Sequence, residues 1–121
     1  MSISARVAPP NSLVLVLDPS GGTIPASLNG ELIAATDSCL AIGCRAEDDG
    51  ETEFILGNSD SIGRGERPAF EGTLKTPSRK IAVRSVLGTM ILEMPVPSGE
   101  TMVRVWVNDP QEPDCITIGI S

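Results

Sequence analysis

Five carboxylates lie within seven consecutive positions of this chain, in the stretch CRAEDDGETEFIL at residues 44–56. The five are Glu47, Asp48, Asp49, Glu51 and Glu53. Clustered carboxylates can hold a divalent cation, attract a basic protein, or simply keep a turn hydrated. An EF-hand calcium loop with its glycine at Gly50 would need Asp or Asn at positions 45 and 47, where the chain has Arg and Glu. We therefore expect no metal here, and the other two possibilities stay open.

The residues between the acids favour an exposed hairpin tip. Asp49-Gly50 is a strong hairpin signal, because both central residues of a type I′ turn need positive φ. With these two residues at the tip, residues 39–46 and 52–56 pair as neighbouring strands and Asp48 faces Glu51. Like charges at facing positions destabilise a hairpin mildly. The density of acidic residues in this stretch favours an acidic docking surface. The alternative is a solvated hairpin tip, whose charges discourage other chains from pairing with the strand edges.

Trp106 is the second candidate for a binding residue, and it is the only tryptophan. The alternation in residues 102–107 places it on the same strand face as Met102 and Arg104, opposite three valines. Trp, Met and Arg are enriched in protein interfaces. The alternative is that Trp106 fills the core or the space between two sheets.

Catalysis is not expected from this sequence. The chain has no histidine, which removes the commonest general base and metal ligand. Neither a Ser-His-Asp nor a Cys-His site is possible, and no nucleotide-binding motif is present. Cys39 and Cys44 would lie about 16 Å apart in one extended strand, beyond disulfide reach. With Cys115 they are expected to be reduced, buried thiols, and no cofactor is predicted.

The formal net charge of −7 bears on the partner. Residues 1–60 carry nine acids and two bases, whereas residues 61–121 carry seven of each. This charge repels nucleic acid, and two Phe and one Trp cannot supply a platform for stacking bases. The expected partner is therefore another protein with a basic surface. The sequence does not fix the oligomeric state.

Strands are the elements that must position these residues. Short apolar or alternating runs bounded by Gly, Pro, Asn and Asp predict strands at residues 13–17, 39–46, 52–56, 70–75, 80–86, 90–96, 102–107 and 115–120. Residues 28–37 could form a short helix or a strand, and residues 57–69 are expected to form a long surface loop. The pattern predicts an all-β, single-domain antiparallel β-sandwich of about seven or eight strands over residues 1–121.

The N-terminal region does not have the pattern of a signal peptide. Its apolar run, Leu13 to Leu17, is shorter than the roughly 7–15 residues of a secretory apolar region. No run approaches the ~20 apolar residues that span a bilayer. We expect a cytoplasmic protein without a membrane association.

The segments LVLVLDPSG, FEGTLKTPSRKIAV and VRVWVNDPQEPDCITIGI, together with the acidic stretch, resemble small bacterial β-sandwich proteins of the competence-protein-J type. The likeness covers most of the chain as a pattern of strands and turns. Members of that group are regarded as inhibitors or immunity partners of nucleases. The resemblance implies an acidic protein that blocks a basic, nucleic-acid-handling enzyme.

Two functions from different classes follow. The first is a non-enzymatic protein-binding role, as an inhibitor or immunity partner of a basic nuclease or toxin, through Glu47, Asp48, Asp49, Glu51, Glu53 and Trp106. The alternative is a structural or assembly module that associates through strand edges or the Trp106 face.

Overall fold

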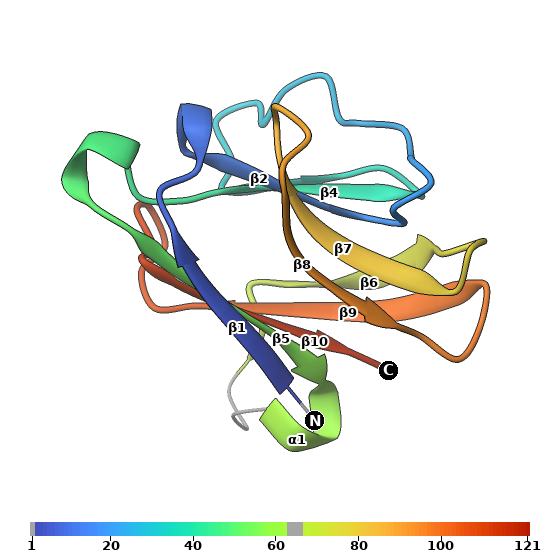
Figure 1. Cartoon of the computed structure of the whole chain (residues 1–121). Coiled ribbons are helices and arrows are strands. Elements are labelled where there is room, and N and C mark those ends of the chain that lie inside the picture. The colour runs from blue at the N-terminus through green and yellow to red at the C-terminus, as the bar shows by residue number, and fades with distance from the viewer. Residues whose placement is uncertain (1, 63–66) are drawn as a thin grey trace.

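The computed structural model describes residues 2–62 and 67–121 and arranges them as two stacked β-sheets (Figure 1). The first sheet has the order β1-β5-β10-β9-β6, and the second has the order β3-β4-β2-β7-β8. The strands of the first sheet are β1 (Ser2–Val7), β5 (Thr52–Asn58), β10 (Cys115–Ile120), β9 (Glu100–Val107) and β6 (Phe70–Lys75). Those of the second are β3 (Ile33–Ala35), β4 (Cys39–Gly43), β2 (Leu13–Leu17), β7 (Lys80–Ser85) and β8 (Met90–Pro95). The predicted all-β sandwich is confirmed.

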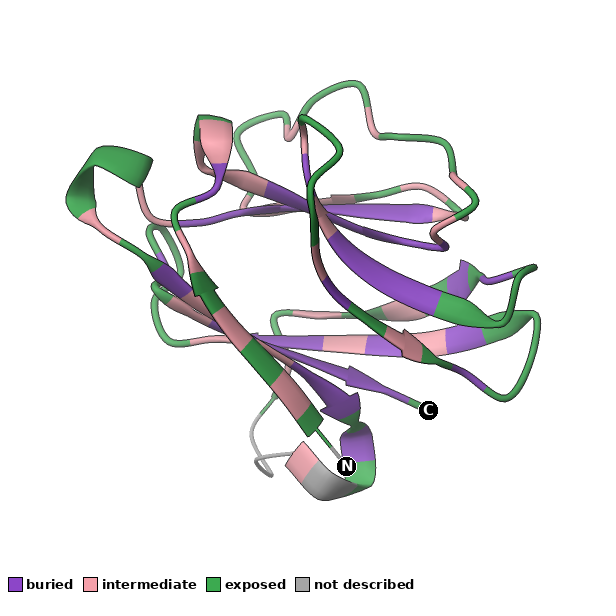
Figure 2. Ribbon diagram, in the orientation of Figure 1, coloured by how far each residue is buried: buried purple, intermediate pink, exposed green. Residues whose placement is uncertain are grey.

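A mainly aliphatic core lies between the sheets, and Figure 2 colours the buried residues of both sheets purple. β2 shows why its sequence is a continuous apolar run. Val14 and Val16 face the main core, whereas Leu15 and Leu17 face a smaller cluster on the outer side of the second sheet. Leu28, from the long β2–β3 connection, packs against this outer cluster. Both faces of the central strand are therefore buried, which explains why residues 13–17 are all apolar.

Two strands go beyond the predicted set, giving ten among the described residues. β1 is an edge strand that pairs with β5 and turns Ile3, Ala5 and Val7 toward the core. β3 settles the ambiguity at residues 28–37, because the regular structure there is this three-residue strand and not a helix. The sheets are also not wholly antiparallel, since β10 pairs with β5 in parallel.

The predicted hairpin at Asp49-Gly50 is wrong. Glu47–Asp49 form a 3₁₀ turn, η2, and of the two expected positive-φ residues only Gly50 has one, at 124°. β4 and β5 lie in different sheets, so Asp48 and Glu51 do not face each other across a ladder. The expected strand at residues 39–46 also ends early, at Gly43.

Burial explains why this local turn signal fails. Leu40 and Ile42 of β4 and Phe54 and Leu56 of β5 are all fully buried in the same core. A hairpin would place all four in one sheet. The crossover instead brings them against the core from opposite layers, so apolar burial outweighs turn propensity.

The remaining connections contain one short helical turn and one further 3₁₀ turn. The predicted loop at residues 57–69 begins later than expected, because β5 continues to Asn58 and a single helical turn, α1 (Ser59–Ile62), follows. Residues 63–66 of that loop lie outside the described residues. A short 3₁₀ turn, η1 (Pro10–Ser12), links β1 to β2. Within the described ranges, no helix is both long and apolar enough to cross a bilayer.

Candidate docking surface

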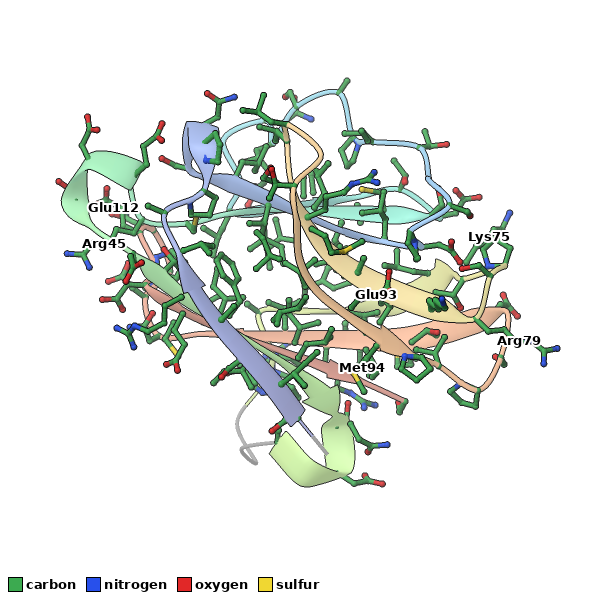
Figure 3. All side chains as sticks on the ribbon, viewed as in Figure 1. Arg45, Lys75, Arg79, Glu93, Met94 and Glu112 are labelled. Atoms are coloured by element: carbon green, nitrogen blue, oxygen red, sulfur yellow. The ribbon has the colours of Figure 1, made fainter. Side chains whose placement is uncertain are left out.

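The acidic turn η2 and the β9–β10 loop, residues 108–114, lie side by side at one end of the sandwich. The Arg45 amide donates a hydrogen bond to the Pro113 carbonyl at 2.9 Å, and the Glu53 amide donates one to the Asp114 carbonyl at 2.8 Å. Figure 3 shows Glu112 and Arg45 next to each other beside the coil of η2. Segments some sixty positions apart in the sequence thus form one surface.

This contact enlarges the acidic cluster that the sequence suggested. Glu47, Asp48, Asp49 and Glu51 are exposed, as expected for a docking surface or a solvated turn. The β9–β10 loop adds three more exposed carboxylates. We call the combined set the acidic end: Glu47, Asp48, Asp49, Glu51, Glu53, Asp109, Glu112 and Asp114.

Two described guanidinium groups offset part of this charge. Arg45 lies 3.6 Å from Asp114, with both side chains partly exposed. Arg6 lies 4.0 Å from Glu53, whose carboxylate also accepts a weak hydrogen bond from the Cys115 thiol at 3.7 Å. Eight carboxylates against these two bases leave a formal charge of −6. Because eight carboxylates outnumber these two bases, the acidic end stays strongly negative. The two exposed ion pairs contribute little to stability.

Internal hydrogen bonds hold the β9–β10 loop in shape. The Asp109 carboxylate accepts hydrogen bonds from the amides of Gln111 and Glu112 at 2.8 and 2.9 Å. These bonds, that from Glu112 first, lower the pKa of Asp109. Asn108 donates to the Asp114 carboxylate at 2.6 Å and accepts from the Asp114 amide at 3.1 Å. The loop is therefore pre-organised before any partner arrives.

A polar hollow of about 440 Å³ opens between η2 and this loop. Its lining is Arg45, Asp49, Asn108, Asp109, Glu112 and Asp114. Arg45 is the one base in that lining, and its guanidinium lies against Gly50, where an added Cβ would come within 3.3 Å of a guanidinium nitrogen. The hollow thus suits a cationic group. Among the described residues, no three metal-ligating side chains are grouped closely enough to hold an ion.

Trp106 is placed differently from the acidic end. It lies on the outer face of the first sheet, as the alternation predicted, but it is only 7% exposed and does not line the polar hollow. Its ring packs beside Gly119 and Ser59, because an added Cβ at Gly119 would lie 2.9 Å from the ring and 2.7 Å from the Ser59 hydroxyl. In this conformation Trp106 offers little surface to a partner.

Two of the three thiols, Cys39 and Cys44, are poor nucleophiles because they are buried. Burial raises the pKa of Cys39 to about 11, with Arg84 opposing the rise, and burial also raises the pKa of Cys44. Such thiols are poorly ionised at neutral pH and react slowly. Cys115 is half-buried and sits beside the Glu53 carboxylate. None of the three is disulfide-bonded.

Sequence reasoning missed the contribution of the β9–β10 loop. The stretch NDPQEPD at residues 108–114 contains three of the eight acids and was visible as a turn. Its meeting with η2 depends on β10 lying beside β5, a parallel pairing that no local pattern signals. The high density of acidic residues in this turn, next to a predicted strand, was the signal in the sequence that could have indicated its role.

No protein-family model matches the chain. No curated protein matches it in sequence. Among solved structures, the fold is similar to the crystal structure of ComJ, inhibitor of the DNA degrading activity of NucA, from Bacillus subtilis. That alignment has a TM-score of 0.68 and 14% identity, and covers 99% of this chain and 96% of ComJ. A second structure, Crocagin biosynthetic gene J, aligns with a TM-score of 0.47 at 13% identity over 98% and 94% of the two chains.

The likeness to ComJ bears out the resemblance seen in the sequence, at the level of the fold. At 14% identity it identifies an architecture and not a shared site. The class defined so far is a β-sandwich with the ComJ arrangement of strands and one strongly acidic end.

Proposed function

We propose that this chain is a protein-binding inhibitor whose acidic end docks on a basic nuclease. The observation that carries the proposal is the convergence of eight carboxylates from the η2 region, the start of β5 and the β9–β10 loop, with two bases, on a framework fixed by backbone hydrogen bonds. The similarity of the fold to ComJ, an inhibitor of NucA, supports the choice of a nuclease among basic proteins.

The physical basis is competition with DNA. A nuclease must hold phosphates with Lys and Arg side chains, so its substrate groove is positively charged. A rigid surface of charge −6 is complementary to such a groove and can occupy it in place of DNA. Its field also steers the encounter and raises the association rate, and this rise weakens with salt.

The test is a nuclease inhibition assay with a matched pair of triple variants. The first carries D48N, D49N and E51Q on the acidic end. The control carries D60N, E93Q and E100Q, which remove the same charge from exposed positions elsewhere. NucA of Bacillus subtilis and basic nucleases encoded near this chain's gene are the nucleases to assay.

We expect the first variant to inhibit about tenfold or more weakly, mainly through slower association, with a reduced dependence on salt. The control variant should inhibit like the parent. Equal loss in both variants would point to net charge alone, and no loss in the first would refute the acidic end as the docking surface.

The alternative, a structural or assembly module, has less support. It was expected to use strand edges or the Trp106 face, and Trp106 is 7% exposed. Sedimentation of the isolated chain over a wide concentration range tests it. Concentration-dependent assembly that is lost in W106A but not in the acidic variant would favour this function over inhibition.

A further inference from the structure

The β9–β10 loop is a ridge with different chemistry on its two sides. One side borders the polar hollow described above. On the other side lie two further hollows of about 340 and 220 Å³, and both are lined by Glu31, Leu32 and Pro110. The two hollows share these three lining residues and so adjoin each other beside the start of β3, and we call the pair the groove.

The lining of this groove combines aliphatic side chains with polar groups, and apolar surface predominates only in the smaller hollow. Leu28 and Gln111 line the larger hollow, while Ile33 and Val107 line the smaller. Glu31 is the one charged side chain among the described lining residues, and it is exposed. The groove therefore offers an apolar site in its smaller hollow, with Glu31 as an acidic rim.

One wall of the smaller hollow is fixed by a close contact within β6. The Phe70 ring lies over Gly72, where an added Cβ would be 2.8 Å from the ring. A glycine at this position leaves room for the edge of the ring close to the backbone of its own strand. The wall, like the hydrogen-bonded ridge, is thus pre-formed, which lowers the cost of ordering an interface.

Charge indicates which kind of partner can bind across the polar hollow and the groove. A second copy of this chain carries a net charge of −7, so its approach to the acidic rim is unfavourable overall. Nucleic acid is repelled for the same reason. A partner segment with one cationic and one aliphatic side chain suits both sides of the ridge. The cation would bind in the polar hollow, and the aliphatic side chain would bind in the groove. In an extended segment, side chains two residues apart point the same way at a spacing of about 7 Å.

We propose that the β9–β10 loop binds a segment of the partner that carries Lys or Arg close to an aliphatic residue. The cation enters the hollow beside Asp49 and Glu112, and the aliphatic side chain enters the groove beside Leu32 and Pro110. This inference rests on the proposed function, because it specifies what the same partner presents to the site.

The probe is a synthetic peptide that repeats Lys-Ser-Leu-Ser, so that Lys and Leu share one face. A Lys-Ser-Ser-Ser repeat controls for charge and a Glu-Ser-Leu-Ser repeat controls for the apolar side chain. Amide chemical shifts of the whole chain are followed during titration. We expect the first peptide to bind about tenfold more tightly than the charge control, and to shift the amides of Leu32, Ile33 and Gln111 as well as that of Glu112.

Two single variants test the groove directly. L32A shortens a leucine in the groove, and L87A makes the same change at a leucine that is 76% exposed on the β7–β8 connection. L32A should weaken the Lys-Ser-Leu-Ser peptide about threefold to tenfold and leave the Lys-Ser-Ser-Ser peptide unchanged. L87A should alter neither. A thermal melt of each variant verifies that the fold is retained.

Equal binding of the two cationic peptides, or no binding of either, would overturn this inference. So would equal effects of L32A and L87A. The inhibition assay distinguishes this failure from a failure of the proposed function. If the acidic variant loses inhibition while L32A retains it, the docking surface stands and the groove is not part of it.

Discussion

At the scale of single residues, Asp18 shows how a buried charge is satisfied in this fold. It follows β2 and is fully buried. Its carboxylate accepts hydrogen bonds from the Ser20 amide at 2.7 Å, the Ser78 amide at 2.7 Å and the Ser78 hydroxyl at 2.8 Å. Burial alone would raise the pKa of Asp18, but these hydrogen bonds outweigh it and the pKa is lowered. Asp18 thus ties the end of β2 to the β6–β7 turn.

The change D18N should reduce the free energy of unfolding by about 2 kcal/mol at neutral pH, since hydrogen bonds to a charged group are lost. The folded pKa lies below the unfolded value, so the carboxylate stabilises the fold fully above pH ~4 and less as pH falls through the folded pKa. In urea denaturation, the difference between the two proteins should therefore begin to shrink below pH ~4 and vanish only below the folded pKa of Asp18. The exposed Asp37, paired with Lys75 at 3.0 Å, gives a control: D37N should change stability little. A pH-independent difference would contradict this role for Asp18.

At the scale of elements, the sequence predicts best where burial and local pattern agree. β2, β6 and β10 have the bounds expected from their runs, because their apolar residues alternate or cluster and Gly, Pro or Asp stands at the ends. β1 was missed because its inward positions are small or partly exposed, with Ala5 between Ile3 and Val7. η2 was mistaken for a hairpin because the choice of sheet for β5 depends on distant strands, which no local pattern contains.

The packing of β10 against α1 gives a test at this scale. An added Cβ at Gly119 would lie 2.7 Å from the Ser59 hydroxyl and 2.9 Å from the Trp106 ring, closer than van der Waals contact. We expect G119A to lower the free energy of unfolding by about 1–3 kcal/mol. G99A is the matched control, because the nearest atom to its Cβ is 4.0 Å away. If chemical denaturation finds G119A as stable as G99A, then Trp106 is not held by this contact.

At the scale of the whole molecule, the packing of the two sheets brings together acidic residues that lie far apart in the sequence. The η2 acids were identifiable from their sequence, whereas Asp109, Glu112 and Asp114 join them only because β10 begins beside the start of β5. The same convergence sets the ridge between the polar hollow and the aliphatic groove. A site assembled from loops of both sheets, on a core that buries its strands, can vary its surface without disturbing the fold.

The concentration of charge should carry a cost in stability that salt can relieve. Like charges at the acidic end repel one another in the folded protein more than in the expanded unfolded chain. The variant with D48N, D49N and E51Q should therefore melt a few degrees higher than the parent at low ionic strength. Near 1 M salt, where screening acts within about 3 Å, the two melting temperatures should coincide. The variant with D60N, E93Q and E100Q removes the same charge from scattered exposed positions and should gain less. If both variants gain equally, the stabilisation reflects net charge, and the acidic end carries no special repulsion. Scanning calorimetry at several salt concentrations measures the melting temperatures of all three proteins. A rise in melting temperature that is confined to the variant at the acidic end would show that the protein keeps this surface at the expense of stability.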